Sequence, residues 1–212
     1  MKETEIKSRI LQAANDMMIQ YGIRSVSMDD IAGSLGMSKK TLYQYFKDKD
    51  ELVEQVIVAI IQKNECECQE DRKLAENAIH EIFLVIDMLE DLFKSMNPAV
   101  LFDLQKYHPK AYLIIIEHKY KFLLSQVKEN LRQGIEQKLF RPDINIEIMS
   151  RYRIETMFMP FSVEFNRDLN YSIMECQHQI ILNFLYGMVT PKGYEMIETY
   201  RKSKLNTSPL KA

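Results

Sequence analysis

Residues 25–52 read SVSMDDIAGSLGMSKKTLYQYFKDKDEL, and this stretch decides the fold. Ser27, followed three residues later by Asp30, is an N-capping pattern that predicts a helix ending near Leu35. Ser38 offers a second N-cap soon after Leu35 and predicts that another helix begins at once. The turn between the two helices is therefore so short that it fits only a helix-turn-helix.

Helices are also predicted on both sides of this pair. From Glu5 to Tyr21, apolar residues recur at spacings of three and four, which is one face of a helix, and Gly22 follows as a C-terminal stop. Asp48 with Glu51 predicts the cap of a fourth helix, which carries a broad apolar stripe. The first fifty residues thus predict three helices packed around a small core.

The third helix, residues 39–46, carries side chains suited to DNA. Leu42 and Phe46 lie four residues apart and can face inward together. The remaining surface then carries Lys39, Lys40, Thr41, Tyr43, Gln44 and Tyr45. Lysine donates to guanine or phosphate, glutamine pairs with adenine edges, threonine contacts a thymine methyl, and tyrosine hydroxyls reach phosphate oxygens. These residue types therefore match the chemistry of a DNA major groove.

The charge of the chain is unevenly distributed. The formal net charge is −2, which is unusual for a DNA-binding protein, so the distribution matters more than the sum. Residues 1–50 carry 8 basic and 7 acidic side chains, residues 51–200 carry 16 and 23, and residues 201–212 carry 4 and none. Within residues 36–49, four lysines face the single acid Asp48, which favours attraction to phosphate. A charge cluster is often only a solvated surface, but the flanking caps and aromatic residues favour contact with DNA.

The rest of the chain also predicts helices, without any alternating strand pattern. Further helices are predicted over residues 74–96, in a short segment that reaches Tyr107, and over 110–137, 146–165, 172–189 and Pro191 to about Lys204. We therefore expect an all-α fold, with a three-helix helix-turn-helix domain at residues 1–50 and a C-terminal helical domain at residues 51–205. Residues 206–212 are expected to form a disordered tail.

Residues 25–32 and 35–52 together resemble the N-terminal domain of the TetR (tetracycline-repressor-like) family. The pair Tyr21-Gly22 also falls where that family places it. Ser27 stands where threonine is commoner, which preserves the cap, and Lys40 stands where the family often has glycine. The sequence leaves open whether Lys40 reads bases or adds only charge and bulk.

The resemblance implies roles in binding double-stranded operator DNA for nine residues. Ser38 belongs to this set as the N-cap of the third helix. Phosphate contacts are implied for Ser27, Tyr43, Tyr45 and Lys49. Groove contacts are implied for Lys39, Lys40, Thr41 and Gln44. The resemblance further implies a homodimer that represses transcription and that an apolar or amphipathic small-molecule effector releases from its operator.

Two C-terminal segments, 146–165 and 172–189, have wide apolar faces, as a four-helix interface between two subunits requires. The resemblance implies that they pair with a second copy and that the helices before them enclose the effector. The expected dimer contacts are Tyr152, Phe165, Cys176, Ile180, Phe184 and Met188. The expected pocket residues are Phe83, Phe102, Tyr107, Tyr120, Met157, Phe158 and Phe161. A methionine or aromatic residue at helical spacing is core packing more often than a ligand site, so this second interpretation stands beside the first.

Two other classes of function fit part of the sequence. Glu175-x-x-His178 places a carboxylate and an imidazole on one helix face, but a di-iron bundle needs two such motifs and two further glutamates. A helical adaptor that binds only protein would explain the apolar faces, but it leaves the basic third helix unexplained. The chain has neither a Gly-x-Ser-x-Gly motif nor a phosphate-binding glycine loop. We therefore expect no catalytic residues, no metal, no cofactor and no enzyme activity.

We expect a cytoplasmic protein that does not enter a membrane. The three cysteines, Cys66, Cys68 and Cys176, are an odd number in a chain that needs no disulfide, which favours reduced thiols. The most apolar run, Val56 to Ile61, is much shorter than the ~18 residues of a membrane span. The N-terminal residues are mixed in charge and lack the apolar stretch of a secretory signal.

Overall fold

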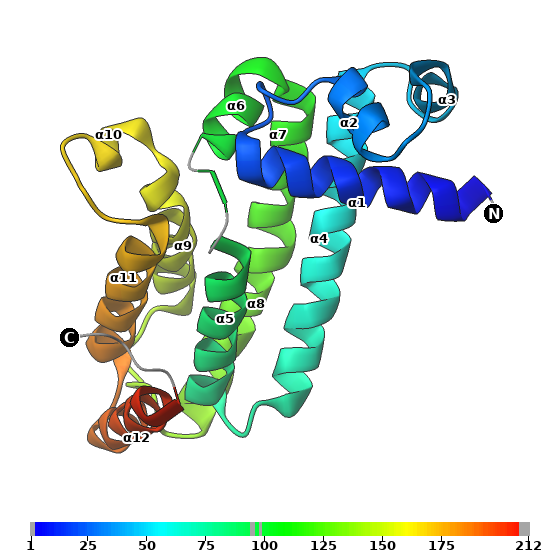
Figure 1. Cartoon of the computed structure of the whole chain (residues 1–212). Coiled ribbons are helices and arrows are strands. Elements are labelled where there is room, and N and C mark those ends of the chain that lie inside the picture. Colours follow the sequence, from blue (N-terminus) through cyan, green and yellow to red (C-terminus); the bar gives the residue numbers. More distant parts are fainter. Residues whose placement is uncertain (1–2, 94–95, 98, 208–212) are drawn as a thin grey trace. The chain divides into compact units, whose positions relative to one another are not determined.

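The computed structural model describes residues 3–93, 96–97 and 99–207. In this part of the chain every regular element is a helix, which confirms the predicted all-α class (Figure 1). The α-helices are α1 (Glu3–Tyr21), α2 (Met28–Ser34), α3 (Lys39–Tyr45), α4 (Lys49–Leu74), α5 (Ala78–Phe93), α6 (Val100–Tyr107), α7 (Pro109–His118), α8 (Leu124–Glu136), α9 (Ile146–Phe158), α10 (Val163–Asn166), α11 (Ile173–Met188) and α12 (Pro191–Thr207). A π-helical turn, Lys119–Leu123, joins α7 to α8, and a 3₁₀ turn, Met159–Phe161, follows α9.

Side-chain caps begin α2 and α3, as the sequence predicts. The Ser27 hydroxyl oxygen accepts a hydrogen bond from the Asp30 N–H at 3.1 Å, and the Asp30 carboxylate accepts one from the Ser27 N–H at 2.8 Å. These hydrogen bonds from Ser27 lower the pKa of the Asp30 carboxyl. Ser38 starts α3 in a similar way, because its hydroxyl oxygen accepts from the Thr41 N–H at 3.1 Å. The two caps stabilise the short helices from which the helix-turn-helix is built.

Two glycines end the helices that precede these caps. Gly22 follows α1 with a φ of +84°, and Gly36 follows α2 with a φ of +64°. Both values lie in the left-handed region, which glycine enters at little cost because it has no Cβ. The predicted cap of the fourth helix is also confirmed, since the Asp48 carboxylate accepts from the Glu51 N–H at 2.8 Å.

The described chain forms two compact units, of which the first contains residues 1–66 and 92–119. Its core is drawn from α1 to α4, α6 and α7, and its most buried side chains include Ile10, Ile31, Leu42, Phe46, Leu52 and Leu104. The Asp103 carboxylate accepts from the Arg24 N–H at 3.1 Å, and His108 Nδ1 lies 2.6 Å from the Asp50 carboxylate. These contacts connect the helix-turn-helix and α4 to the segment around α6. The predicted domain boundary at residue 50 stays a prediction.

The second unit contains, of the described residues, 67–91 and 120–207. Its hydrophobic core comes from α5, α8, α11, α12 and the loop after α8, and includes Ile79, Ile86, Leu131, Phe140, Leu185, Met188 and Ile197. Helix α9 contacts both α8 and α11, and Figure 1 shows α9 and α11 side by side.

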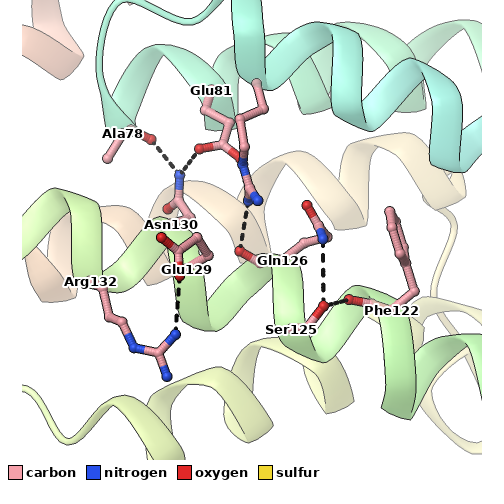
Figure 2. Close-up of polar contacts among 9 residues, drawn as sticks. Ala78, Glu81, Phe122, Ser125, Gln126, Glu129, Asn130 and Arg132 are labelled. Carbon is pink, nitrogen blue, oxygen red and sulfur yellow. Dashed lines mark hydrogen bonds and ion pairs between the residues drawn. The ribbon is translucent and has the colours of Figure 1, made fainter.

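A buried polar cluster joins α4, α5 and α8 within this unit. Figure 2 shows the Asn130 amide nitrogen between the Ala78 carbonyl oxygen and the Glu81 carboxylate, at 2.9 and 2.8 Å. Arg72 donates to the other oxygen of Glu81 at 2.9 Å and to the Gln126 carbonyl oxygen at 3.1 Å. The buried carboxylate of Glu81 is thus paired and hydrogen-bonded, which a charge in a protein interior requires.

The predicted helix over residues 146–165 is wrong in its second half. Helix α9 ends at Phe158, and Pro160 lies in the 3₁₀ turn that follows. Proline cannot continue a helix because it has no N–H to donate and its ring clashes with the preceding turn. A separate short helix, α10, then begins after Ser162, whose side chain accepts from the Phe165 N–H.

The predicted start of the next helix near Leu74 is also wrong. Leu74 is the last residue of α4, which is longer than expected, and α5 begins at Ala78. The Asn77 side-chain oxygen accepts from the Ile79 and His80 N–H groups at 3.0 and 2.9 Å, and so caps α5. The apolar pattern continues across this break and conceals it.

The predicted helix over residues 110–137 is helical almost throughout, although the π-helical turn interrupts its hydrogen-bond pattern. The last helix runs to Thr207, so Asn206 and Thr207 of the predicted tail belong to α12. The other tail residues, 208–212, lie outside the described residues.

Candidate nucleic-acid interface

Helix α3 presents one face to solvent and buries the other. Leu42 is fully buried and Phe46 is 1% exposed, so this pair anchors α3 to the core of the first unit. The predicted outward side chains Lys39, Lys40, Tyr43 and Gln44 are exposed, while Thr41 and Tyr45 are half-buried. The prediction of a solvent-facing third helix is confirmed.

Lys39 is held by an acid of the preceding helix. Its ammonium lies 2.9 and 3.0 Å from the two carboxylate oxygens of Asp29 in α2. The hydrogen bond to Asp29 raises the pKa of the Lys39 ammonium. The same ammonium lies 6.0 Å from the ring centroid of Tyr43, one turn further along α3. Lys39 therefore reaches an anion outside the chain only in competition with Asp29, a residue that the sequence interpretation did not single out.

Lys40 and Gln44 are differently placed. They lie four residues apart, so they share a face of α3, and both are exposed. Neither side chain makes a hydrogen bond or an ion pair in the described part of the chain. Both side chains can therefore donate to phosphate or to base edges without first breaking a contact within the described chain.

Three further residues of the predicted DNA-binding set, namely Ser38, Thr41 and Tyr45, make contacts that stabilise α3 itself. The hydroxyls of Ser38 and Thr41 are 2.8 Å apart and hydrogen-bonded to each other. Tyr45 packs its ring against the core of the first unit. The ring of Tyr43, in contrast, is 42% exposed, which leaves its hydroxyl near solvent.

Lys49 points toward its own chain. Its ammonium donates to the Ile23 carbonyl oxygen at 2.6 Å, and this bond ties the first turn of α4 to the segment that follows α1. Burial lowers the pKa of the Lys49 ammonium, against the opposing effect of Asp103 and other nearby acids. A phosphate contact by Lys49 would compete with this internal hydrogen bond.

The predicted pocket residues fall in both compact units. Phe102 and Tyr107 belong to the first unit, and both are more than one-third exposed. The other five belong to the second unit, in which the rings of Phe158 and Phe161 lie 6.4 Å apart and Phe83 is buried. A surface hollow of the second unit has a different lining, namely Tyr186, Val189, Thr190, Pro191, Tyr194 and Glu195. The predicted pocket therefore stays a prediction.

The predicted dimer contacts also differ in exposure. Tyr152 on α9 is 45% exposed, whereas Cys176, Phe184 and Met188 on α11 are buried within the single chain. Phe165 and Ile180 are half-buried. Ile148, which the sequence interpretation did not select, is 63% exposed one turn before Tyr152. The outward face of α9 therefore offers more apolar surface to a second copy than α11 does.

Glu175 and His178 do not form part of a metal cluster in the described residues, where no group of three or more suitable side chains occurs. The Glu175 carboxylate instead accepts from the Ser172 N–H at 2.7 Å and completes a capping box at the start of α11. Of the described helices, none combines the length and hydrophobicity needed to cross a membrane.

Comparison with known proteins places this geometry in a family. Residues 10–56 match the family described as "Bacterial regulatory proteins, tetR family". The uncharacterized HTH-type transcriptional regulator YvaF of Bacillus subtilis (strain 168) is 31% identical over 131 residues, which cover 59% of this chain and 67% of that protein. The HTH-type transcriptional repressor KstR2 of Mycobacterium tuberculosis is 22% identical over 203 residues, or 88% of this chain and 94% of that one.

The fold agrees with solved structures over most of the chain. A TetR-family transcriptional regulator from Agrobacterium tumefaciens has a TM-score of 0.72 at 17% identity, with 89% of this chain and 100% of that chain covered. Since the helix-turn-helix, its exposed third helix and the match to a relative over two-thirds of its length agree, the chain belongs to the TetR family of bacterial regulatory proteins and is a DNA-binding transcriptional regulator.

Proposed function

We propose that this chain acts as a homodimeric repressor in the cytoplasm, without catalysis, and that a small-molecule effector releases it from a near-palindromic operator. Each subunit places α3 in the major groove, so that the two helices enter successive grooves about 34 Å apart on one face of the duplex. The observation that carries this proposal is the exposed face of α3, on which the side chains of Lys40 and Gln44 have no partner among the described residues.

The DNA contacts divide into two groups. Lys39, Lys40, Thr41 and Gln44 supply the groove contacts, and Lys40 and Gln44 are the strongest candidates because they are free to donate. Ser27, Ser38, Tyr43, Tyr45 and Lys49 are assigned to the phosphate backbone, where contacts fix orientation rather than sequence. Tyr43 is the best placed of these, whereas Lys49 contributes mainly by holding the first turn of α4 against the segment that follows α1.

Dimerisation and release rest on the C-terminal helices. The exposed apolar side chains Ile148 and Tyr152 on α9 support pairing with the same helix of a second copy. Repression is supported by the relative from Mycobacterium tuberculosis, whose name is that of a repressor. The effector binds more tightly to a dimer in which the two α3 helices are wrongly spaced for successive grooves. Effector binding therefore favours that dimer and lowers the affinity for the operator.

The test uses DNA that the wild-type chain selects from a random duplex library. We expect two chains, or a multiple of two, on each selected duplex by analytical ultracentrifugation. The logarithm of the binding constant should fall with the logarithm of salt concentration, with a slope of about −3.6 if two lysines of each subunit each neutralise one phosphate. Binding by a single chain, or binding that salt does not weaken, would contradict the proposal.

Asp29→Asn should tighten operator binding, since the change frees Lys39 and removes a negative charge beside the phosphates. We expect a rise in affinity of about threefold to tenfold, because an exposed ion pair is weak and the steering of DNA by charge is strong. Fluorescence anisotropy at fixed salt measures the change. Asp16→Asn, an exposed residue of α1, alters the net charge equally and should leave the affinity nearly unchanged. Equal effects of the two variants would show that net charge alone, and not the release of Lys39, governs binding.

A further inference from the structure

The inward face of α9 carries a charged residue. Ser150 and Ile154 on this face are fully buried, and Arg153 between them is only 3% exposed. Its guanidinium carbon lies 5.8 Å from the ring centroid of Phe184 in α11. The Nη1 atom of Arg153 is buried and has no hydrogen-bond partner in the described residues. An arginine has thus been placed where a hydrophobic residue would normally lie.

The guanidinium of Arg153 has no acidic partner among the described residues. No carboxylate of the described residues pairs with it, in contrast to Arg72, which binds the buried Glu81 in the same unit. Burial lowers the pKa of Arg153 to about 10, so the side chain remains positively charged at neutral pH. A buried cation without a partner is unfavourable, and proteins normally pair such a charge or replace it. The unit therefore keeps an unfavourable feature that an added anion would relieve.

A second unsatisfied polar group lies on the facing helix. Gln177 of α11 is 1% exposed, and its amide nitrogen donates to the Met157 carbonyl oxygen of α9. Its side-chain oxygen is buried and has no hydrogen-bond partner in the described part of the chain. Gln177 and Phe184 are separated by two turns of α11, or about 10 Å along the helix axis. The contact between α9 and α11 thus has a cation near one end and an unused acceptor near the other.

Each of these two groups has a buried apolar residue near it on its own helix. Ile181, between Gln177 and Phe184 in α11, is 2% exposed, and Ile154 in α9 is fully buried. A ligand that suits this region has an anionic group for Arg153 and an apolar body for its neighbours. A guanidinium binds a carboxylate through two parallel N–H···O bonds.

We propose that Arg153 binds the carboxylate of an apolar organic acid, and that this acid lies along the contact between α9 and α11 in the second unit. The proposal rests on the proposed function, because it names the chemical class of the effector.

The test compares acids with neutral molecules of the same shape on the wild-type protein. Octanoate, decanoate, dodecanoate and 2-naphthoate are titrated by calorimetry beside the matching alcohols. We expect at least one acid to bind roughly tenfold to a hundredfold more tightly than its alcohol. A ratio of this size is expected because only the acid makes a charge-assisted hydrogen bond to Arg153. Equal binding of each acid and its alcohol, or no binding of any acid, would overturn the proposal.

A variant of Arg153 then tests whether the preference for the acid depends on this side chain. Arg153→Met keeps most of the volume and removes the charge, so it should raise the melting temperature of the unliganded protein and abolish the preference for the acid. The same change at its exposed neighbour, Arg151→Met, should do neither. A variant that still prefers the acid would remove Arg153 from the site.

The two proposals fail in different ways. Loss of acid binding with normal operator binding overturns the ligand site and leaves the DNA-binding regulator intact. Acid binding that leaves operator affinity unchanged supports the site but contradicts the proposed release. Arg153→Met should bind the operator like the wild type when no acid is present, which shows that its fold and its DNA-binding helices are preserved.

Discussion

The double variant Lys40→Ala, Gln44→Ala should bind its operator about a thousandfold more weakly than the wild type, or worse. Each lost contact to a base or phosphate costs about 1–3 kcal/mol in protein–DNA complexes, and a dimer loses every contact twice. Both side chains are exposed and have no partner in the described chain, so their removal should leave the fold unchanged. Circular dichroism checks the fold, and fluorescence anisotropy measures the affinity.

A matched control removes the same residue types elsewhere. Lys192→Ala, Gln69→Ala changes one exposed lysine and one exposed glutamine of the second unit. We expect this variant to bind the operator as the wild type does. Wild-type affinity in the α3 variant, with normal binding in the control, would exclude α3 as the helix that reads DNA.

The single variant Lys40→Ala decides what this lysine contributes. A contact to phosphate should be lost equally from every DNA sequence, and the salt dependence should become shallower by about 0.9 per lysine. A contact to a base should be lost only from sequences that carry the preferred base at one position. The two results are distinguished by repeating the selection from a random library with the variant protein.

Gly134→Ala should destabilise the second unit by roughly 2–4 kcal/mol and lower its melting temperature by about 5–15 °C. A Cβ atom at Gly134 would lie 2.0 Å from Cδ2 and 2.3 Å from Cε2 of Phe140. The ring cannot easily withdraw, because it is 1% exposed and the N–H groups of Leu139 and Phe140 both donate to the Gly134 carbonyl oxygen. Thermal and urea unfolding followed by circular dichroism measure the change.

The expected sign is the opposite of what helix propensity predicts. Alanine is favoured over glycine by about 1 kcal/mol within a helix, so Gly134→Ala would be stabilising if propensity decided the outcome. Gly33 in α2 has open space around its Cβ position, and Gly33→Ala should therefore stabilise modestly. Combining Gly134→Ala with Phe140→Leu should recover part of the lost stability. A stable Gly134→Ala protein would mean that the packing of Phe140 on Gly134 is not as tight as described.

Much of the fold can be predicted from the sequence because its decisive signals are local. The cap of α2 is formed by Ser27 and Asp30, which lie within four residues of each other. The cap of α3 is equally local, because the Ser38 hydroxyl oxygen accepts from the Thr41 N–H. The helix boundaries that were predicted wrongly lie where one local signal favours continuing the helix and another favours ending it. Leu74 is the last residue of α4, but its spacing also fits the apolar pattern of α5, and Pro160 interrupts a pattern that otherwise favours helix.

The candidate site could be predicted only in outline. The exposed face of α3 follows from the spacing of Leu42 and Phe46, both of which are buried as predicted. The ion pair between Lys39 and Asp29 depends on the angle between two helices, which spacing does not specify. Arg153 could not be recognised because an arginine in a helical pattern is ordinarily exposed, and only the packing of α9 shows that this one is not.

The ion pair between Lys39 and Asp29 also bears on how the protein searches a chromosome. A bacterial genome offers on the order of a million or more irrelevant sites, and every cation that binds arbitrary phosphates prolongs the stay at each of them. Because Lys39 is already paired with Asp29, it adds little to the time that the protein spends on non-operator DNA. Once the other residues of α3 contact the correct bases, Lys39 can leave Asp29 and bind a phosphate. Tighter binding by Asp29→Asn would therefore come with slower target location, because more of the protein would be sequestered along the chromosome.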